Sequence, residues 1–243
     1  MKHYAYCLTD SPVALEEITG LSRARPYLIR EDEFSAVVSD YAGDAVGATA
    51  ENVFDHQRVV NHVLTQVTPL PFRFASLVSE PAIRRYIRSQ AVGLRATFAR
   101  VRGCVEMAVK VIWDLEAIRQ ISSPVHGSNT SPSGSIGAGT AFLLAKQQEI
   151  LGDELLKSEA AKIAAWLSAR VADYVKAEDV QVRPERALVL TAAFLVERQN
   201  LTQYRDRLTL LQDERKDLRF LTSGPWAPYT FANIALEKGG NSR

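Results

Sequence analysis

The first 113 residues combine two hydrophobic patterns: a period of two, which is typical of strands, and a period near 3.6, which is typical of helices. In residues 51–67, Val53, Val60, Val63 and Val67 recur at helical spacing. In residues 105–111, Val and Met alternate with more polar or smaller residues, as in a half-exposed strand. The strands predicted in this way are residues 3–9, 25–30, 34–39, 72–77 and 105–111, and the helices are residues 11–17, 51–67 and 81–101.

This order of elements predicts a ferredoxin-like α+β domain over residues 1–120. The succession strand–helix–strand, then strand–helix–strand again, is that of the split βαβ fold. In that fold two helices cover one face of an antiparallel sheet. The two helices of this order are residues 11–17 and 51–67, and the helix at 81–101 and the strand at 105–111 follow to complete the domain.

The second half of the chain begins with a change of composition. Residues 121–139 are rich in Ser, Gly, Pro and Asn and have no periodicity, so they predict a linker. Residues 140–176 contain no proline and one glycine, Gly152, and predict a helix of about 55 Å that projects, packs on a partner or breaks near that glycine. Strands at 186–197 and 216–222, with a helix at 201–211, complete a smaller α+β domain over residues 140–243.

The stretch from Ser223 to Phe231 combines three aromatic residues with two prolines. Pro225 and Pro228 fix φ and lack backbone donors, which argues against a helix and favours a rigid turn leading into an edge strand. We expect Trp226 and Phe231 to pack in the core of the second domain. Tyr229 is expected to be the exposed ring.

Charge and composition exclude several classes of partner. The 243 residues carry 29 basic and 28 acidic side chains, a net charge of +1, so neither nucleic acid nor a lipid membrane is expected to bind. The arginines of the helix at 81–101 are interpreted as a solvated face. The chain lacks both a stretch of about 20 apolar residues and the apolar core of a signal peptide, so we expect a cytoplasmic protein. Cys7 and Cys104 lie in apolar runs and predict buried, reduced thiols.

Catalytic and metal-binding patterns are absent from the sequence. His56 and His62 are six residues apart, a poor spacing for one helix face, and a capping or surface role is expected for them. Thr140 follows a glycine-rich stretch but lacks the preceding lysine of a phosphate-binding loop. We therefore expect no enzymatic activity, no metal and no cofactor.

Three segments, in order along the chain, carry a family resemblance. Residues 69–77 (PLPFRFASL), 103–114 (GCVEMAVKVIWD) and 224–231 (GPWAPYTF) resemble the signatures of the gas vesicle protein family GvpF/GvpL. Residues 139–146 also resemble that family. Ala75 stands where the family often has Gly, and Ala227 where it often has a third Pro. Our candidates for structural or partner-contact roles in these segments are Phe72, Arg73, Phe74, Glu106, Trp113, Pro225, Trp226, Pro228, Tyr229 and Phe231.

The resemblance implies a non-enzymatic accessory or minor structural protein of gas vesicles, the gas-filled shells that provide buoyancy. It implies that the chain binds the shell protein GvpA, and other gas vesicle accessory proteins are further candidate partners. It also implies a cytoplasmic protein associated with the shell, with the gas-facing side as one placement.

The alternative is a ligand-sensing domain or an enzyme on the ferredoxin-like scaffold, which hosts unrelated functions. Such a protein would need a pocket of convergent polar groups, with Arg73 and Glu106 beside His56 or His62. The plainer interpretation of Arg73 and Glu106 is an ion pair between strands.

Overall fold

The computed structural model describes residues 2–113, 138–185, 188–232 and 234, with the backbone alone at 138–153, 183–185 and 188. The chain forms two compact units that are each discontinuous in sequence. One unit comprises Met1–Met107, Leu195–Asn200 and Ser223–Arg243, and the other comprises Ala108–Phe194 and Leu201–Thr222. Residues 121–137 of the predicted linker lie outside the described residues, so the predicted domain boundaries stay a prediction.

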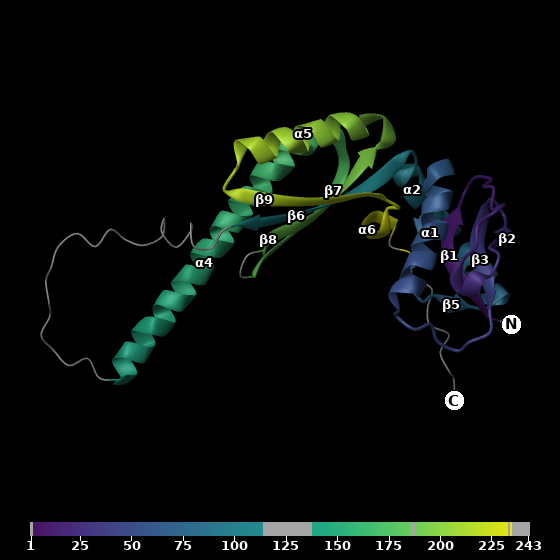
Figure 1. Cartoon of the computed structure of the whole chain (residues 1–243), viewed down its shortest axis with the longest axis horizontal. Coiled ribbons are helices and arrows are strands. Elements are labelled where there is room, and N and C mark those ends of the chain that lie inside the picture. The colour runs from purple at the N-terminus through teal and green to yellow at the C-terminus, as the bar shows by residue number, and fades with distance from the viewer. Residues whose placement is uncertain (1, 114–137, 186–187, 233, 235–243) are drawn as a thin grey trace, which may run out of the picture. The chain divides into compact units, whose positions relative to one another are not determined.

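The first sheet is built around β1, residues Lys2–Thr9 (Figure 1). The strands lie in the order β2 (Tyr27–Glu31), β3 (Phe34–Tyr41), β1 and β4 (Leu70–Pro71), and β5 (Leu77–Val78) also pairs with β1. Every strand that pairs with β1 is antiparallel to it, and β2 is antiparallel to β3. The residues from Tyr4 to Leu8 are fully buried.

Two helices pack on opposite faces of this sheet. On α1 (Ala50–Gln66), His56 lies against the rings of Tyr4 and Tyr6. On α2 (Glu80–Val101), Phe98 stacks on Phe34, with ring centroids 5.6 Å apart. Phe34 and Ser39, the partner of Tyr4 in the register, point to opposite faces because side chains alternate along β3. Since both faces are covered, β1 needs apolar side chains on both, which explains its unbroken run of buried residues.

The short helix predicted at residues 11–17 does not form; those residues are irregular apart from a turn, and a short 3-10 turn, η1, follows at Leu21–Arg23. Side chains from α1 bind the backbone of this segment instead. The amide N–H of Ala14 donates to Gln66 Oε1 at 2.8 Å, and the carbonyl of Ala14 accepts from His62 Nε2 and Gln66 Nε2 at 2.9 Å each. Tertiary contacts thus satisfy polar groups that a helix would have paired.

The strand predicted at residues 72–77 is replaced by the two short strands β4 and β5, with a loop at residues 72–76. Within this loop, Ala75 has a φ of 66°, in the left-handed region that a non-glycine residue rarely adopts. Its amide N–H donates to the hydroxyl of Tyr4 at 3.2 Å. This positive φ interrupts the extended run.

The second half of the chain supplies β6 (Cys104–Trp113), α4 (Ala138–Val171), η2 (Ala172–Tyr174), β7 (Val175–Glu185), β8 (Leu188–Glu197), η3 (Arg198–Asn200), α5 (Leu201–Glu214) and β9 (Leu218–Trp226). The second sheet has the order β7–β8–β6–β9, which is the split βαβ arrangement. Helix α4 connects β6 to β7 with β8 between these strands, and α5 connects β8 to β9 with β6 between them. The first sheet has the same strand order, β2–β3–β1–β4, so the ferredoxin-like strand order predicted for the first domain is confirmed, although the short helix predicted between its first two strands does not form.

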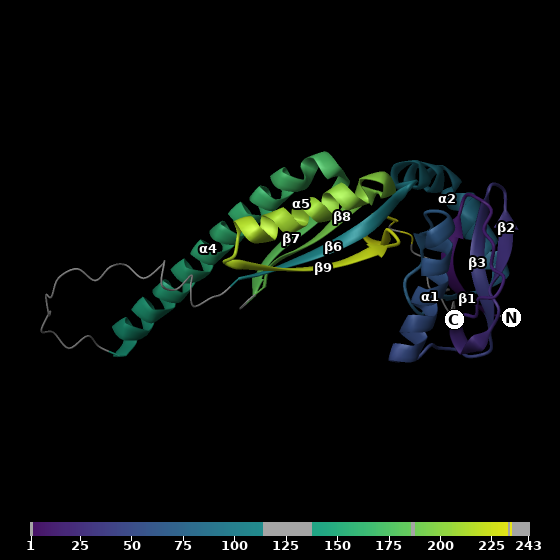
Figure 2. The same cartoon turned by 45° about the horizontal axis from the view of Figure 1, so that its top comes forward.

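Both helices of this sheet lie on one of its sides (Figures 1 and 2). The long helix α4 has 34 residues and continues through Gly152, which at 1.5 Å per residue gives about 51 Å. The predicted apolar stripe late in this helix is confirmed, since Ala160, Leu167 and Val171 are fully buried. Strand β7 is not among the predicted elements, because the predicted helix extends to Lys176 and no element is predicted at residues 177–185.

None of the helices in the described ranges is long and apolar enough to cross a lipid bilayer. Cys7 and Cys104 are both buried, as predicted.

We predict that Ala75→Gly stabilises the protein by about 0.5–1 kcal/mol, because glycine adopts a positive φ without a steric cost. The midpoint of urea unfolding is the measurement. Ala96→Gly is a matched control in the exposed middle of α2 and should cost about 1 kcal/mol. Equal destabilisation by both changes would contradict the assigned conformation of Ala75.

Candidate functional site

Residues of all three sequence segments that carry the family resemblance lie in the first unit, which contains residues 69–77, 103–107 and 224–231. Strand β9 runs to Trp226 at the edge of its sheet, so the edge strand enters this stretch and does not follow a turn within it as predicted, and a one-turn helix, α6, comes next at Tyr229–Ala232. The expectation that the prolines exclude a helix here is therefore wrong for α6. Pro228 precedes the helix, and its carbonyl accepts from the amide of Ala232 at 2.7 Å. At the start of a helix the missing N–H of proline costs nothing.

Glu106, from the second of these segments, holds α6 in place. One carboxylate oxygen accepts from the amide of Thr230 at 2.8 Å, and the other accepts from the hydroxyl of Thr230 at 2.9 Å. The side chain is buried, so its charge depends on such bonds. Glu106 therefore acts as an anchor for the C-terminal stretch.

Close packing at Gly224 fixes the approach of this stretch to β6. Gly224 has a φ of 118°, and a Cβ atom at this position would lie 2.8 Å from the carbonyl oxygen of Glu106. The next nearest atom, the sulfur of Met107, would lie at 3.0 Å. Glycine is thus required here both for its backbone conformation and for the close approach of two chain segments.

A buried histidine links the same stretch to the first sheet. The Tyr4 hydroxyl lies 2.8 Å from Nδ1 of His56, and the Tyr229 hydroxyl lies 3.0 Å from Nε2 of the same ring. Tyr4 accepts from the amide of Ala75, and the Tyr229 hydroxyl lies 3.5 Å from the side-chain oxygen of Gln57. The bonds are all satisfied if neutral His56 carries its proton on Nε2, with Tyr4 donating to Nδ1 and Tyr229 accepting from Nε2.

Burial keeps this network uncharged. It lowers the pKa of His56 to about 4 and raises the pKa values of Tyr4 and Tyr229 above the usual range of tyrosine. The expectation of a capping or surface role for His56 is wrong, since its side chain is buried between two tyrosines. At neutral pH the network joins β1, α1 and the C-terminal stretch without any charged group.

The predicted aromatic residues occupy different environments from those expected. Phe231 is buried but belongs to the first unit, where its carbonyl accepts from the guanidinium of Arg100. Tyr229 is half-buried with its hydroxyl in the histidine network, and is not the exposed ring that was predicted. Trp226 is half-buried, and its indole N–H donates to the hydroxyl of Ser223 at 3.2 Å. The other candidates are buried Phe72, Trp113 and Pro228, half-buried Phe74, and exposed Arg73 and Pro225.

The polar pocket required by the alternative function is not assembled. Arg73 is exposed, and no ion pair within the described residues joins it to Glu106. His62 bonds the backbone of Ala14, away from the groups of the predicted pocket. Of the four side chains of the predicted pocket, only His56 and Glu106 contact the same segment. His56 is hydrogen-bonded to Tyr229, and Glu106 is hydrogen-bonded to the next residue, Thr230.

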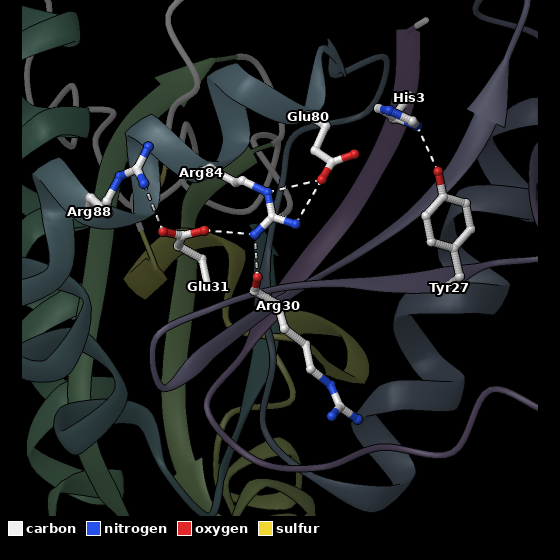
Figure 3. Close-up of polar contacts among 7 residues, drawn as sticks. All are labelled: His3, Tyr27, Arg30, Glu31, Glu80, Arg84 and Arg88. Atoms are coloured by element: carbon white, nitrogen blue, oxygen red, sulfur yellow. Dashed lines mark hydrogen bonds and ion pairs between the residues drawn. The ribbon is translucent and has the colours of Figure 1, made fainter.

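The arginine-rich face of α2 pairs with the acidic turn of the β2–β3 hairpin (Figure 3). Arg84 lies 2.7 Å from both Glu31 and Glu80 and donates to the backbone carbonyl of Arg30 at 2.6 Å. Arg88 lies 3.1 Å from Glu31. These ion pairs give Arg84 and Arg88 a structural role, because they join α2 to the hairpin.

A second polar cluster lies on the α2 face of the first sheet. The hydroxyl of Tyr27 lies 2.8 Å from His3 Nδ1 and 2.8 Å from Asp40 Oδ1 (Figure 3 shows the contact with His3). Burial, and then the hydrogen bond to Asp40, raise the pKa of Tyr27 to about 12. Across the part of the chain that the structure describes, no three or more His, Cys, Asp or Glu side chains are placed to hold a metal ion.

We predict that the buried imidazole makes the stability of the first unit depend on pH. The folded pKa of His56 is about 4, below the value of about 6.5 in an unfolded chain, so only the unfolded chain binds this proton between these values. The stability from this group is complete above pH 6.5 and falls as the pH decreases towards 4. The loss between pH 7 and pH 4.5 should be roughly 2–3 kcal/mol.

The NMR resonances of the His56 ring should accordingly titrate near pH 4. His62→Gln serves as the control, because it should leave the titration of His56 unchanged. A midpoint near 6.5 for His56 in the folded protein would contradict the buried, neutral state.

Comparison with known proteins gives a consistent result. The family described as "Gas vesicle synthesis protein GvpL/GvpF" matches residues 2–233. Gas vesicle protein L1 of Halobacterium salinarum is 28% identical over 254 residues, covering 94% of this chain and 89% of that protein. Gas vesicle protein F of Dolichospermum flosaquae is 24% identical over 238 residues, covering 90% and 91%.

Two crystal structures share the fold. The chain is similar to the gas vesicle protein GvpF of an Anabaena species, with a TM-score of 0.80, 22% identity and coverage of 96% of this chain and 97% of that one. GvpF of Microcystis aeruginosa matches with a TM-score of 0.75, 18% identity and coverage of 96% and 99%. Because the family match spans nearly the whole chain, the protein belongs to the GvpL/GvpF family of gas vesicle proteins.

Proposed function

We propose that this protein is a non-enzymatic accessory or minor structural component of gas vesicles that binds the shell protein GvpA and supports assembly of the shell. The observation that carries the proposal is the family match over residues 2–233. Other gas vesicle proteins are further candidate partners. The protein acts in the cytoplasm, in association with the growing shell.

The bonding of its polar groups supports a binding role without catalysis. His56 is neutral and held by two tyrosines, and Glu106 holds the amide and the hydroxyl of Thr230. Arg84 is held by two carboxylates. Since these groups fix elements of the protein to each other, they are not left to act on a substrate.

Apolar side chains at the surface support contact with a hydrophobic partner. A subunit that packs into a gas-enclosing wall must expose apolar area before it assembles, and such area aggregates unless another protein covers it. The exposed Phe54, Val92 and Leu210 are among the large hydrophobic side chains that this chain offers. Covering the shell protein until it joins the wall is therefore the role that we assign to the chain.

We predict that the chain co-purifies with GvpA, or with intact vesicles, when both are made at native levels. Isolated vesicles would be washed and probed with an antibody against the chain, and GvpA would be sought among proteins captured with a tagged chain. An unrelated cytoplasmic protein of similar size, carrying the same tag, is the control. Repeated absence of the chain from both preparations would refute the proposal.

We place the chain on the gas-facing side of the shell and predict that it resists protease in intact vesicles. The wall then shields it, and collapse of the vesicles by pressure should make the chain cleavable. The measurement is the amount of full-length chain after digestion, before and after collapse. Ready cleavage in intact vesicles would instead place the chain on the outer face.

A further inference from the structure

The first sheet ends on one side at strand β2, and no described strand pairs with the outer edge of β2. The other side of this sheet ends in β4 and β5, which have two residues each and offer little edge for another strand to join. Strand β2 is longer, with the five residues Tyr27–Glu31. It is therefore the edge of this sheet at which a further strand could add.

Two residues of β2 direct their backbone groups towards this outer edge. In an antiparallel pair, residues alternate between those that bond across to the partner strand and those whose N–H and C=O groups point away from it. The carbonyl of Arg30 accepts from Arg84 on α2, so Arg30 belongs to the outward-pointing set. Leu28, two positions earlier, belongs to the same set. These two residues supply the hydrogen-bonding groups that an added strand would use.

The guanidinium of Arg84 occupies the position that an N–H group of an added strand would take. Its Nη1 lies 2.6 Å from the carbonyl oxygen of Arg30. The next strand of a sheet lies about 4.8 Å away and is bonded through such carbonyl groups. Since Arg84 both bonds the acceptor and fills the space beside it, another strand cannot pair at Arg30 while the guanidinium is in place (Figure 3).

Acidic side chains hold Arg84 at this edge. Glu31 accepts from the same Nη1 at 2.7 Å, and Glu80 accepts from Nε at 2.9 Å and from Nη2 at 2.7 Å. Glu31 is itself fixed, because its other carboxylate oxygen lies 3.1 Å from Arg88 Nη1. The guanidinium is planar and its donors have fixed directions, so bonds to all three nitrogens hold it in one orientation. Opening the edge would require several of these bonds to break together.

A second copy of this chain is the strand donor that the geometry of β2 favours. Two β2 strands related by a two-fold axis would run antiparallel, and with Ile29 opposite Ile29 each Leu28 would face Arg30 of the other copy. Because Leu28 and Arg30 both point their backbone groups outward, this register matches donors with acceptors. The same register places Tyr27 opposite Glu31, so no like charges lie directly opposite each other.

We propose that Arg84 closes the β2 edge of the first sheet and so prevents copies of this chain from joining strand to strand. This device acts on the free chain and is separate from the proposed contact with the shell protein. Natural proteins place charged side chains at edge strands for the same purpose, since an unprotected edge is a template for aggregation. Here the protecting side chain comes from a neighbouring helix.

The test is sedimentation velocity of the full-length chain over a range of protein concentrations. Arg84→Met keeps the length of the side chain and removes its donors, and it should shift the sedimenting species to about twice the mass at concentrations at which wild type is unchanged. Arg95→Met is the matched control, because Arg95 lies on the same helix and its described partner is the side chain of Glu33. This control should sediment like wild type.

A second change separates strand pairing from a loss of stability. Arg84→Met removes several bonds, and a less stable chain can associate through segments that have unfolded. Adding Arg30→Pro removes an N–H that points to the outer edge, where proline is tolerated, so the double variant should return to the sedimentation of wild type. Amide hydrogen exchange at Leu28 should slow as Arg84→Met associates and stay fast in the double variant.

Association of Arg84→Met that Arg30→Pro reverses supports the proposal. Three results overturn it: sedimentation of Arg84→Met like wild type at every concentration, association that persists in the double variant, and equal association of Arg95→Met. Association of wild type that Arg30→Pro abolishes would also overturn it, because the edge would then be open with Arg84 in place. A failure of the chain to bind GvpA would change none of these outcomes.

Discussion

The structure of the first unit depends on how its buried polar groups are paired. His56 lies between Tyr4 and Tyr229 with both ring nitrogens in hydrogen bonds, so one neutral imidazole joins the central strand, a helix and the C-terminal stretch. Leaving one of these groups without a partner would cost on the order of 1–3 kcal/mol. The same requirement explains the bonds of Glu106 to Thr230. Apolar side chains fill the core of this unit, and these hydrogen-bonded polar groups determine which segments pack together.

The parts of the fold that local sequence patterns determine were predictable. The helical spacing of Val60 and Val63 identified α1, and the alternation around Met107 identified β6. Elements that depend on contacts between residues far apart in the sequence were not predictable. Residues 11–17 have a helix-like sequence but bind side chains of α1, some 50 positions later. Likewise β7 forms as the neighbour of β8, and its own residues gave no clear alternation.

The candidate site was predictable as a set of segments but not as a geometry. The family resemblance selected the stretches that hold Ala75, Glu106 and Tyr229, and these do connect in the first unit. Their partners could not be read from spacing, because His56 lies 173 positions from Tyr229, and Glu106 lies 124 positions from Thr230. One local signal was available: Ala75 stands where glycine is frequent in the family, and its φ of 66° supplies the physical reason.

The discontinuous first unit has a consequence for synthesis on the ribosome. Its central strand precedes the second unit in the sequence, whereas Tyr229 and Thr230, which bond His56 and Glu106, follow the second unit. The strands of the first sheet are thus all synthesised before the second unit, but the unit itself stays unfinished throughout the translation of the second unit. A chain whose synthesis stops before Tyr229 has an imidazole and a carboxylate that lack these partners. Folding of the first unit therefore cannot be completed until the second unit has been translated.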